Sequence, residues 1–536
     1  MLTVAEYLAE QLVQAGVTTV YGLPGGENVE VLDAIRQRGI NFILVKNESS
    51  ACFMADVHAR LTGTIGVALT TLGPGATNAY VGLAHAYLER SPVLLITAQS
   101  DPHLIGTHTH QVIDLQASFR PITKFTADLS ADNAISTIQH ALQTAQSGRS
   151  GPVHLGINNR VALQNISPSI ANNTSIQSAE VDGGTITSIT DILQNKKKTI
   201  IIVGLGLEPD KPYHQIQKLA ELLNAPVIDT PKSKGALPAR HPLFAGTIGL
   251  SRTDPAYEIL DEADCILTIG FDVVELVKPW NQSQPLIWIA NWENQDPRIP
   301  ADVEYIGDIS TLLDTLNESL DFKTDESWGS KRVTKFHAQL KAIPLPQPQE
   351  GRILPQHVLT TIREYTPDDI VVTTDVGSHK IFTALNWQAQ VPNQYFVSNG
   401  LSAMGFGLVS AIASARVTGK PTICITGDAG LAMVTGELGL LAELAVPVIV
   451  VVMNDSALDL IRSAQTRRQR PAFGTEFTNP DYELIARAYR LAYRRVQSSD
   501  DCQCAIQDAL QSHKSMLIDA MIDPIGYPTT VIEKQG

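Results

Sequence analysis

The sequence predicts an α/β protein of three domains, each built on a mostly parallel sheet flanked by helices. Short apolar runs of strand length alternate with amphipathic segments of helix length almost throughout, a pattern typical of parallel α/β domains. At 536 residues the chain is too long for one ordinary hydrophobic core. A polar break at residues 165–184 and a proline-rich break at 343–352 divide it into pieces of normal domain size. We expect domains at 1–165, 185–342 and 352–536.

Composition excludes several classes of function. The formal net charge of −15 and the lack of a clustered basic tract make nucleic acid an unexpected partner. No apolar run is long enough to span a bilayer, and the opening MLTVAEYLAEQLVQAG is an amphipathic helix pattern without the features of a targeting leader. The five cysteines are scattered and odd in number, which indicates free thiols in a reducing compartment. We therefore expect a cytoplasmic protein.

The most informative segment is residues 422–454. It has the pattern of a buried strand, a Gly-Asp-Ala-Gly turn at 427–430, a helix, and a second buried strand that ends at Asn454. The carboxyl ends of parallel strands lie at one edge of a sheet, so Asp428 and Asn454 should meet there. A carboxylate and an amide oxygen beside a helix N-terminus suit Mg²⁺ bound to a diphosphate. The alternative is an ordinary strand–helix–strand unit whose Asp and Asn cap helices.

This segment resembles the diphosphate-binding motif of thiamine-diphosphate enzymes, Gly-Asp-Gly followed by Asn, with Ala429 in place of the second glycine. The three-part layout resembles the acetolactate synthase and pyruvate decarboxylase group of that family over essentially the whole chain. The resemblance implies that the first domain binds the pyrimidine of thiamine diphosphate and the third binds its diphosphate. It also implies Mg²⁺ ligation by Asp428, the side chain of Asn454 and the backbone carbonyl of Ser456.

Glu48 is the candidate catalytic acid. It follows a strand-like run and opens a helix-like segment, FILVKNESSACFMADVHARLTG, that matches the family segment carrying that acid. In the family the acid bonds to the cofactor's pyrimidine and assists loss of a thiazolium proton. By itself, an acid at a helix start is better explained by its interaction with the helix macrodipole, which contributes about 0.3–1 kcal/mol.

Further site residues follow from the resemblance. In the first domain it implies catalytic contacts for Gly25, His110 and Gln111, and cofactor contacts for Glu48, Thr71 and Asn78. A lone histidine is more often structural, but a His-Gln pair could hydrogen-bond a substrate carboxylate or carbonyl. In the third domain it implies cofactor contacts for Gly377, Ser378, His379, Ser402, Met404, Gly427, Ala429, Gly430 and Asn454. Helix capping is the alternative for Ser378 and His379, and core packing is the alternative for Met404.

Two departures bear on relatives that also bind a flavin. Gly204-Leu205-Gly206 lacks the third glycine of a dinucleotide fingerprint, and residues 266–281 lack the arginine-led element of flavin-binding relatives. We therefore expect no FAD and a resemblance to the catabolic, flavin-free acetolactate synthases. Ser463 stands where the biosynthetic synthases have a tryptophan, which puts their substrate preference in doubt.

The resemblance implies an enzyme that decarboxylates a 2-oxo acid, with pyruvate the expected donor, and joins the product to a second carbonyl. It also implies a homodimer or homotetramer with active sites at the subunit interface. A decarboxylase without ligation is one alternative. A non-catalytic paralogue that binds the cofactor is another, disfavoured because Glu48, Asp428 and Asn454 are all retained.

Overall fold

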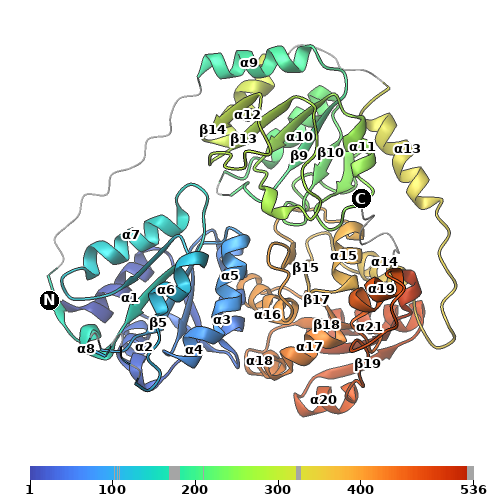
Figure 1. The fold of residues 1–536 in the computed structure, drawn as a ribbon. Coiled ribbons are helices and arrows are strands. Elements are labelled where there is room, and N and C mark those ends of the chain that lie inside the picture. Colours follow the sequence, from blue (N-terminus) through green and yellow to red (C-terminus); the bar gives the residue numbers. More distant parts are fainter. Residues whose placement is uncertain are drawn as a thin grey trace. The chain divides into compact units, whose positions relative to one another are not determined.

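The computed structural model describes residues 1–101, 103, 104, 107, 109–167, 182–208, 210–320 and 327–527 (Figure 1). The chain forms two compact units. The first consists of residues 1–175, 400–420 and 433–446, and the second of residues 176–399, 421–432 and 447–536. Three six-stranded sheets, one in the first unit and two in the second, have parallel pairing throughout. The predicted fold class is confirmed.

The sheet of the first unit has the order β3 (Asn41–Leu44), β2 (Thr19–Leu23), β4 (Gly66–Thr70), β5 (Val93–Ala98), β7 (Val153–Ile157), β6 (Phe125–Asp128). Strands β4, β5 and β7 are buried along their whole length, which explains their continuous apolar sequences. A short antiparallel pair joins β1 (Leu2–Thr3) to β8 (Asn165–Ile166). The helices are α1 (Val4–Gln14), α2 (Val29–Gln37), α3 (Glu48–Thr62), α4 (Pro74–Asn78), α5 (Tyr80–Leu88), α6 (Leu115–Phe119), α7 (Ala134–Gln146) and α8 (Asn159–Ala162).

Two later helices also belong to the first unit: α16 (Phe406–Thr418) and α18 (Leu438–Glu443). Helix α16 packs against α3. The Phe406 ring lies 5.6 Å from the ring of Phe53 and 4.7 Å from that of His85, measured between centroids. Helix α16 is buried nearly all round, in keeping with its Gly, Ala, Ser and aliphatic sequence.

The central sheet of the second unit has the order β11 (Phe244–Thr247), β10 (Val227–Asp229), β9 (Thr199–Val203), β12 (Cys265–Ile269), β13 (Leu286–Ala290), β14 (Val303–Ile306). In chain order this is 3-2-1-4-5-6, the order of dinucleotide-binding sheets. Its helices are α9 (Gly183–Gln194), α10 (Tyr213–Leu223), α11 (Tyr257–Glu262), α12 (Ile309–Ser319) and α13 (Ser330–Lys341).

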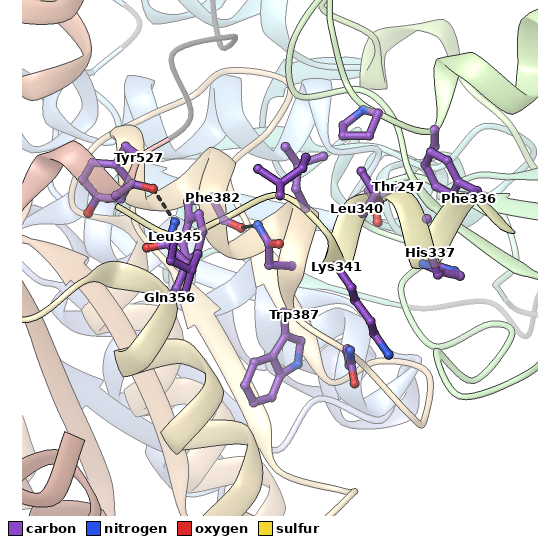
Figure 2. A pocket seen from close by; sticks show the side chains of 18 of the residues that line it. Thr247, Phe336, His337, Leu340, Lys341, Leu345, Gln356, Phe382, Trp387 and Tyr527 are labelled. Carbon is purple, nitrogen blue, oxygen red and sulfur yellow. Dashed lines mark hydrogen bonds between the residues drawn. The ribbon is translucent and has the colours of Figure 1, made fainter. Parts of the chain in front are cut away.

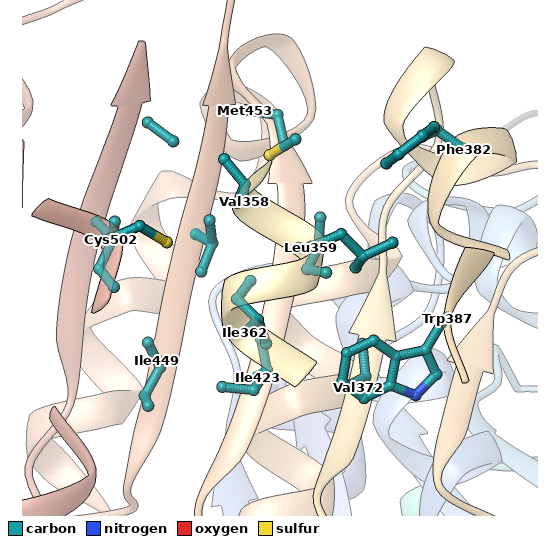
Figure 3. Close-up of a cluster of buried hydrophobic side chains, with 14 of the residues drawn as sticks. Val358, Leu359, Ile362, Val372, Phe382, Trp387, Ile423, Ile449, Met453 and Cys502 are labelled. Carbon is teal, nitrogen blue, oxygen red and sulfur yellow. The ribbon is translucent and has the colours of Figure 1, made fainter. Parts of the chain in front are cut away.

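The other sheet of the second unit has the order β16 (Tyr395–Val397), β15 (Val371–Thr374), β17 (Thr422–Gly427), β18 (Val448–Asn454), β20 (Met516–Met521), β19 (Ala492–Val496). Helices α14 (Pro355–Tyr365), α15 (Ser378–Asn386), α17 (Asp428–Met433), α19 (Asp459–Arg467), α20 (Tyr482–Ala488) and α21 (Ser499–Ser512) accompany it. Figure 3 shows Val358, Leu359 and Ile362 of α14 over the apolar strand residues of this sheet. This packed core therefore fixes the positions of the strands, and the predicted metal ligands lie at the ends of these strands.

Other expectations from the sequence can be compared directly with this structure. All five cysteines are free, and all but Cys504 are buried, as predicted. Within the described part of the chain, every helix is too short or too polar to cross a membrane.

A buried ion pair lies at one end of the central sheet. The ammonium of Lys234 donates to Thr247 Oγ1 at 2.8 Å and to the Trp387 carbonyl at 3.2 Å, and lies 4.0 Å from Asp229 Oδ1. Thr247 in turn donates to Asp229 at 2.6 Å. Both charged residues are 3 % exposed. Burial raises the pKa of Asp229 to about 6, against the opposing effect of the Lys234 charge.

Replacing Lys234 by methionine should destabilise the protein because Asp229 would remain buried without its counter-charge. We expect the free energy of unfolding to fall by about 3–5 kcal/mol, measured by urea unfolding. Arg240→Met is the matched control because it breaks an exposed ion pair with Asp368, in which the Arg240 side chain is 68 % exposed. This variant should lower the free energy of unfolding by less than about 1 kcal/mol. Equal losses in the two variants would contradict this account of the buried pair.

His154 on β7 makes stability depend on pH. The ring is fully buried and hydrogen-bonds Thr97 Oγ1 at 2.9 Å and Thr126 Oγ1 at 2.8 Å. Burial lowers the pKa of His154 to about 3. The unfolded chain takes up this proton near pH 6.5 and the folded protein does not, so the stability contribution is present above pH 6.5 and lost as pH falls toward 3.

We therefore expect His154→Gln to lose less stability than the unchanged protein on acidification. Between pH 7 and pH 5 the difference should be about 2 kcal/mol, from urea unfolding at each pH. An identical pH dependence in the two proteins would show that His154 is not its source.

Candidate active site

The strand order of the third sheet places two glycine-containing loops next to each other. Strand β15 is the first of the sheet in chain order and β17 the third, and they are neighbours in it. The point between such strands is a topological switch, where open α/β sheets bind ligands beyond the strand carboxyl ends. Gly377, Ser378 and His379 follow β15, and residues 427–430 lie at the end of β17 and the start of α17.

Side-chain oxygens of Asp428, Asn454 and Ser456 converge on one amide group, whereas the Ser456 carbonyl, which is the predicted ligand atom, accepts the Phe477 N–H at 3.2 Å. Asn479, at the loop before α20, donates from Nδ2 to Asp428 Oδ2 at 2.8 Å, Asn454 Oδ1 at 2.9 Å and Ser456 Oγ at 3.2 Å. The amide nitrogen of Asn479 therefore lies where these oxygens converge. The backbone N–H of Ser456 also donates to Asp428 Oδ2 at 2.7 Å.

Buried neighbours fix the orientation of this group. Asp519 on β20, which is fully buried, accepts a hydrogen bond of 2.7 Å from Asn454 Nδ2 and so turns the amide oxygen of Asn454 toward Asp428. Tyr482 donates to Asn479 Oδ1 at 3.2 Å. Burial raises the pKa of Asp428, and the amides that bond to it oppose the rise. The buried carboxylate lies in an environment that a cation would stabilise.

The donor set suits a hard cation. Asp428 offers one carboxylate, Asn454 an amide oxygen and Ser456 a backbone carbonyl, which is the oxygen chemistry that Mg²⁺ prefers. Among the described residues no three His, Cys, Asp or Glu side chains group as a metal centre. A metal at this position would therefore depend on amide and carbonyl oxygens and on oxygens of its ligand.

The loop after β15 forms a tight cradle around His379. A Cβ added at Gly377 would lie 2.7 Å from the His379 ring, and one added at Gly427 would lie 2.8 Å from it. Gly377 also has φ of 152°, a conformation that other residues rarely adopt. Burial lowers the pKa of His379 to about 4, so the ring is neutral at neutral pH. Its buried Nε2 has no hydrogen-bond partner among the described residues and fits a ligand that brings one.

The remaining residues of this loop group are placed as follows. Gly430 is required because a Cβ there would lie 2.5 Å from Asp375 Oδ2. Ala429, which replaces the family's second glycine, is partly exposed and has room for its methyl group. Ser378 opens α15 and donates to Asp459 Oδ2 at 2.6 Å. Arg462 pairs with Asp459 at 3.0 Å.

In the first unit, the predicted acid lies in a second cradle. Glu48 is the first residue of α3 and 5 % exposed, and its Oε2 accepts from Asn78 Nδ2 at 3.1 Å. A Cβ added at Gly75 would lie 2.7 Å from Thr71 Cγ2 and 3.3 Å from Glu48 Oε1. The glycine is what allows the β4 loop to approach the acid closely.

The other predicted residues of this unit lie around the same loop, at the switch point between β2 and β4. A Cβ at Gly25 would lie 2.3 Å from Thr71 Oγ1, which itself donates to Glu27 at 2.9 Å. A Cβ at Gly73 would lie 3.0 Å from Gln111 Cβ. The structure thus brings Gly25, Glu48, Thr71, Asn78 and Gln111 together, whereas His110 is exposed.

Three predicted site residues that are not glycine have positive φ: Gln111 at 60°, Ser402 at 56° and Ser456 at 58°. Such strained conformations concentrate at binding and catalytic sites. Ser402 and Met404 lie in the loop before α16 in the first unit, Ser402 exposed and Met404 half-buried.

Sequence reasoning missed Asn479, Asp519 and Glu27. Asp519 carried a signal, since an aspartate inside the apolar run Met516–Met521 requires a buried partner. Asn479 and Glu27 lie in polar turns with no periodic context, and their partners come from distant segments.

A separate cavity of about 670 Å³ lies in the second unit (Figure 2). Apolar side chains, among them Phe336, Leu340, Phe382 and Trp387, form most of its wall. Figure 2 shows Gln356 at its edge, bonded to the carbonyl of Gly526. None of the predicted cofactor or metal residues lines it. The candidate site is therefore defined by the strand ends and not by this cavity.

Comparison with known families identifies the class. Three domain models of the thiamine pyrophosphate enzymes match the chain: the N-terminal binding domain at residues 2–118, the central domain at 186–316 and the C-terminal binding domain at 375–520. The chain belongs to the thiamine pyrophosphate (thiamine diphosphate) enzymes, as the resemblance predicted.

Relatives within the family are similar over nearly their full length. A probable acetolactate synthase large subunit of Methanococcus aeolicus is 30 % identical, over 97 % of this chain and 92 % of that protein. The acetolactate synthase isozyme 3 large subunit of Escherichia coli is 28 % identical, over 98 % and 95 %. The putative thiamine pyrophosphate-containing protein YdaP of Bacillus subtilis is also 28 % identical, over 97 % and 92 %.

Asp428→Asn should weaken binding of Mg²⁺ with thiamine diphosphate, because it removes the one carboxylate among the expected ligands. Loss of a residue that merely supports a ligand costs 10–100-fold in metal affinity, so we expect a loss of roughly 100-fold or more, by calorimetric titration. Asp508→Asn, which removes an exposed partner of Arg494, is the control and should bind normally. Full affinity in Asp428→Asn would place the metal elsewhere.

Proposed function

We propose that the protein is a thiamine diphosphate- and Mg²⁺-dependent acetolactate synthase. Two pyruvate anions and one proton would give one acetolactate anion and one CO₂. The observation that carries the proposal is the convergence of side-chain oxygens of Asp428, Asn454 and Ser456 on the amide nitrogen of Asn479, next to the Ser456 backbone. The names of the full-length relatives support the choice of reaction.

Bound thiamine diphosphate would supply the carbon nucleophile and the electron sink for decarboxylation. The chain's part would be to bind, orient and move protons. Asp428, Asn454 and the Ser456 carbonyl would hold Mg²⁺, and the neutral His379 would donate an N–H to the diphosphate end. Glu48 would hydrogen-bond the pyrimidine, where its proton assists activation.

Substrate contacts would come from the first unit. Gln111 lies against Gly73 in the Glu48 cluster, and its amide can both donate to and accept from a 2-oxo acid. His110, exposed beside it, would hydrogen-bond a substrate carboxylate. Gly25 would let the β2 loop approach the reacting atoms. Ser402 and Met404 would support the cofactor rings.

We infer that FAD has no place in the central domain. The dinucleotide crevice of a 3-2-1-4-5-6 sheet lies beyond β9 and β12. There the Leu205 N–H donates to the Glu275 carboxyl at 2.9 Å, so this carboxyl stands where a dinucleotide phosphate would be expected. In addition, a Cβ added at Gly206 would lie 1.9 Å from the Trp292 ring. Both contacts support the absence of a dinucleotide phosphate from this turn.

A homodimer or homotetramer with active sites between subunits is part of the proposal. Large apolar side chains are exposed on each unit, including Val81 at 47 % in the first and Phe473 at 85 % in the second. Exposed apolar residues that are scattered singly are normal on a monomer, so this part of the proposal depends on the resemblance to the family. Light scattering of the purified protein would give the mass of the assembly.

The experiment that tests the proposal supplies pyruvate, thiamine diphosphate and Mg²⁺ without flavin, and follows CO₂, acetaldehyde and acetolactate together. We expect acetolactate and CO₂ in equal amounts. Glu48→Gln should lower kcat by roughly 10²–10⁴-fold, the usual contribution of a general acid–base group, while still binding the cofactor. Acetaldehyde in place of acetolactate would mean that the protein is a decarboxylase without ligation and would contradict the proposed synthase. If the protein binds the cofactor but turns over none of the 2-oxo acids supplied, it is a non-catalytic paralogue and the proposed activity is wrong.

A further inference from the structure

Two of the three sheets have the same topology. In chain order the sheet of the first unit and the third sheet both read 2-1-3-4-6-5. Helix α3 follows the second strand of its sheet, and α16 follows the second strand of the other. The loops before α3 and α16 are therefore equivalent positions in two related domains, and both lie in the first unit.

A buried carboxylate binds the loop before α3. Glu437, at the turn before α18, is 1 % exposed. Its Oε1 accepts the backbone N–H groups of Lys46 and Asn47, each at 3.0 Å, and its Oε2 accepts that of Lys46 at 3.1 Å. Burial raises the pKa of Glu437, while bonds from Ser50 and from these amides oppose the rise.

A second buried carboxylate makes the reciprocal contact. Glu89, directly after α5, is 3 % exposed and accepts the backbone N–H of Gly400 at 2.6 Å. Gly400 begins the loop that carries Ser402 and Met404 before α16. Helices α5 and α18 follow the third strands of the two related sheets, so each domain contributes one glutamate to the other's loop.

We propose that Glu437 is a positioning residue for Glu48, and that Glu89 is its counterpart for the loop of Ser402 and Met404. Glu48 is the next residue after Asn47, so the three amide contacts of Glu437 fix the backbone from which the acid projects. Charge-assisted bonds of this kind are stronger and more directional than neutral ones. The inference rests on the proposed role of Glu48 toward the cofactor.

The same two segments offer a matched control. Lys46 Nζ lies 3.2 Å from Glu443 on α18, but this pair is exposed, with 36 % and 54 % of the two side chains accessible. Glu443→Gln removes a charge between the same elements without touching the Lys46 and Asn47 amides. An exposed pair of this type contributes little to stability.

The first measurement is hydrogen exchange of the cofactor-free protein by mass spectrometry, over the peptide that spans residues 44–52. Glu437→Ala should raise the exchange rate of this segment by at least roughly tenfold, since it removes the only acceptor that we identify for these two amides among the described residues. Glu443→Gln should leave it unchanged. Unchanged exchange in Glu437→Ala would overturn the inference without bearing on the proposed function.

The second measurement is a double-mutant cycle between Glu437 and Glu48. Glu437→Ala should lower kcat by roughly 100-fold with little change in KM for pyruvate, as expected for a misplaced catalytic group. Glu437→Gln, which keeps an oxygen for the amides, should recover part of the loss. In the Glu48→Gln background, Glu437→Ala should change kcat and cofactor affinity by less than about twofold, because the two residues act as one unit.

The outcomes separate the two hypotheses. Losses that multiply in the double variant would mean a general structural role for Glu437 and would overturn the inference. If Glu48→Gln itself alters neither kcat nor cofactor affinity, the proposed role of Glu48 fails, and the positioning role falls with it even if the exchange result holds.

Discussion

The alignment of parallel strands is the constraint on which this structure depends. Asp428 and Asn454 are far apart in sequence, yet β17 and β18 pair in register with Gly427 opposite Met453, so both polar residues emerge at one edge. The strands themselves are buried along their whole length. A rigid apolar sheet therefore sets the separation of the oxygens, and the loops need only supply chemistry.

That constraint also explains what could be predicted. The alternation of strands and helices and the position of Glu48 at a helix start follow from local sequence and are found in the structure. The expected Gly-Asp-Ala-Gly turn is instead the last residue of β17 and the first turn of α17. The groups that orient these residues could not be found in this way. Asn479, Asp519 and Glu437 hydrogen-bond residues that are 25, 65 and 391 positions away in sequence. The sequence around each of them does not predict which residue it will bond.

The central sheet illustrates why strand order alone does not give a function. Its 3-2-1-4-5-6 order is that of dinucleotide-binding proteins, but at the turn after β9 the Leu205 N–H donates to the Glu275 carboxyl and Gly206 lies against the Trp292 ring. Burial raises the pKa of Glu275 to about 8, against the opposing effects of its hydrogen bonds and of the Lys232 charge.

The division of the chain into units has a consequence for synthesis. The first unit includes residues 400–420 and 433–446, which leave the ribosome long after residue 175. At typical elongation rates of about 5–20 residues per second, the nascent N-terminal sheet waits on the order of tens of seconds before α16 and α18 are available to it. During that interval the apolar face of α3 that later contacts Phe406 has no native cover. Protection of this surface by a chaperone, or by a homologous nascent chain nearby, would then influence how much of the protein reaches its folded state.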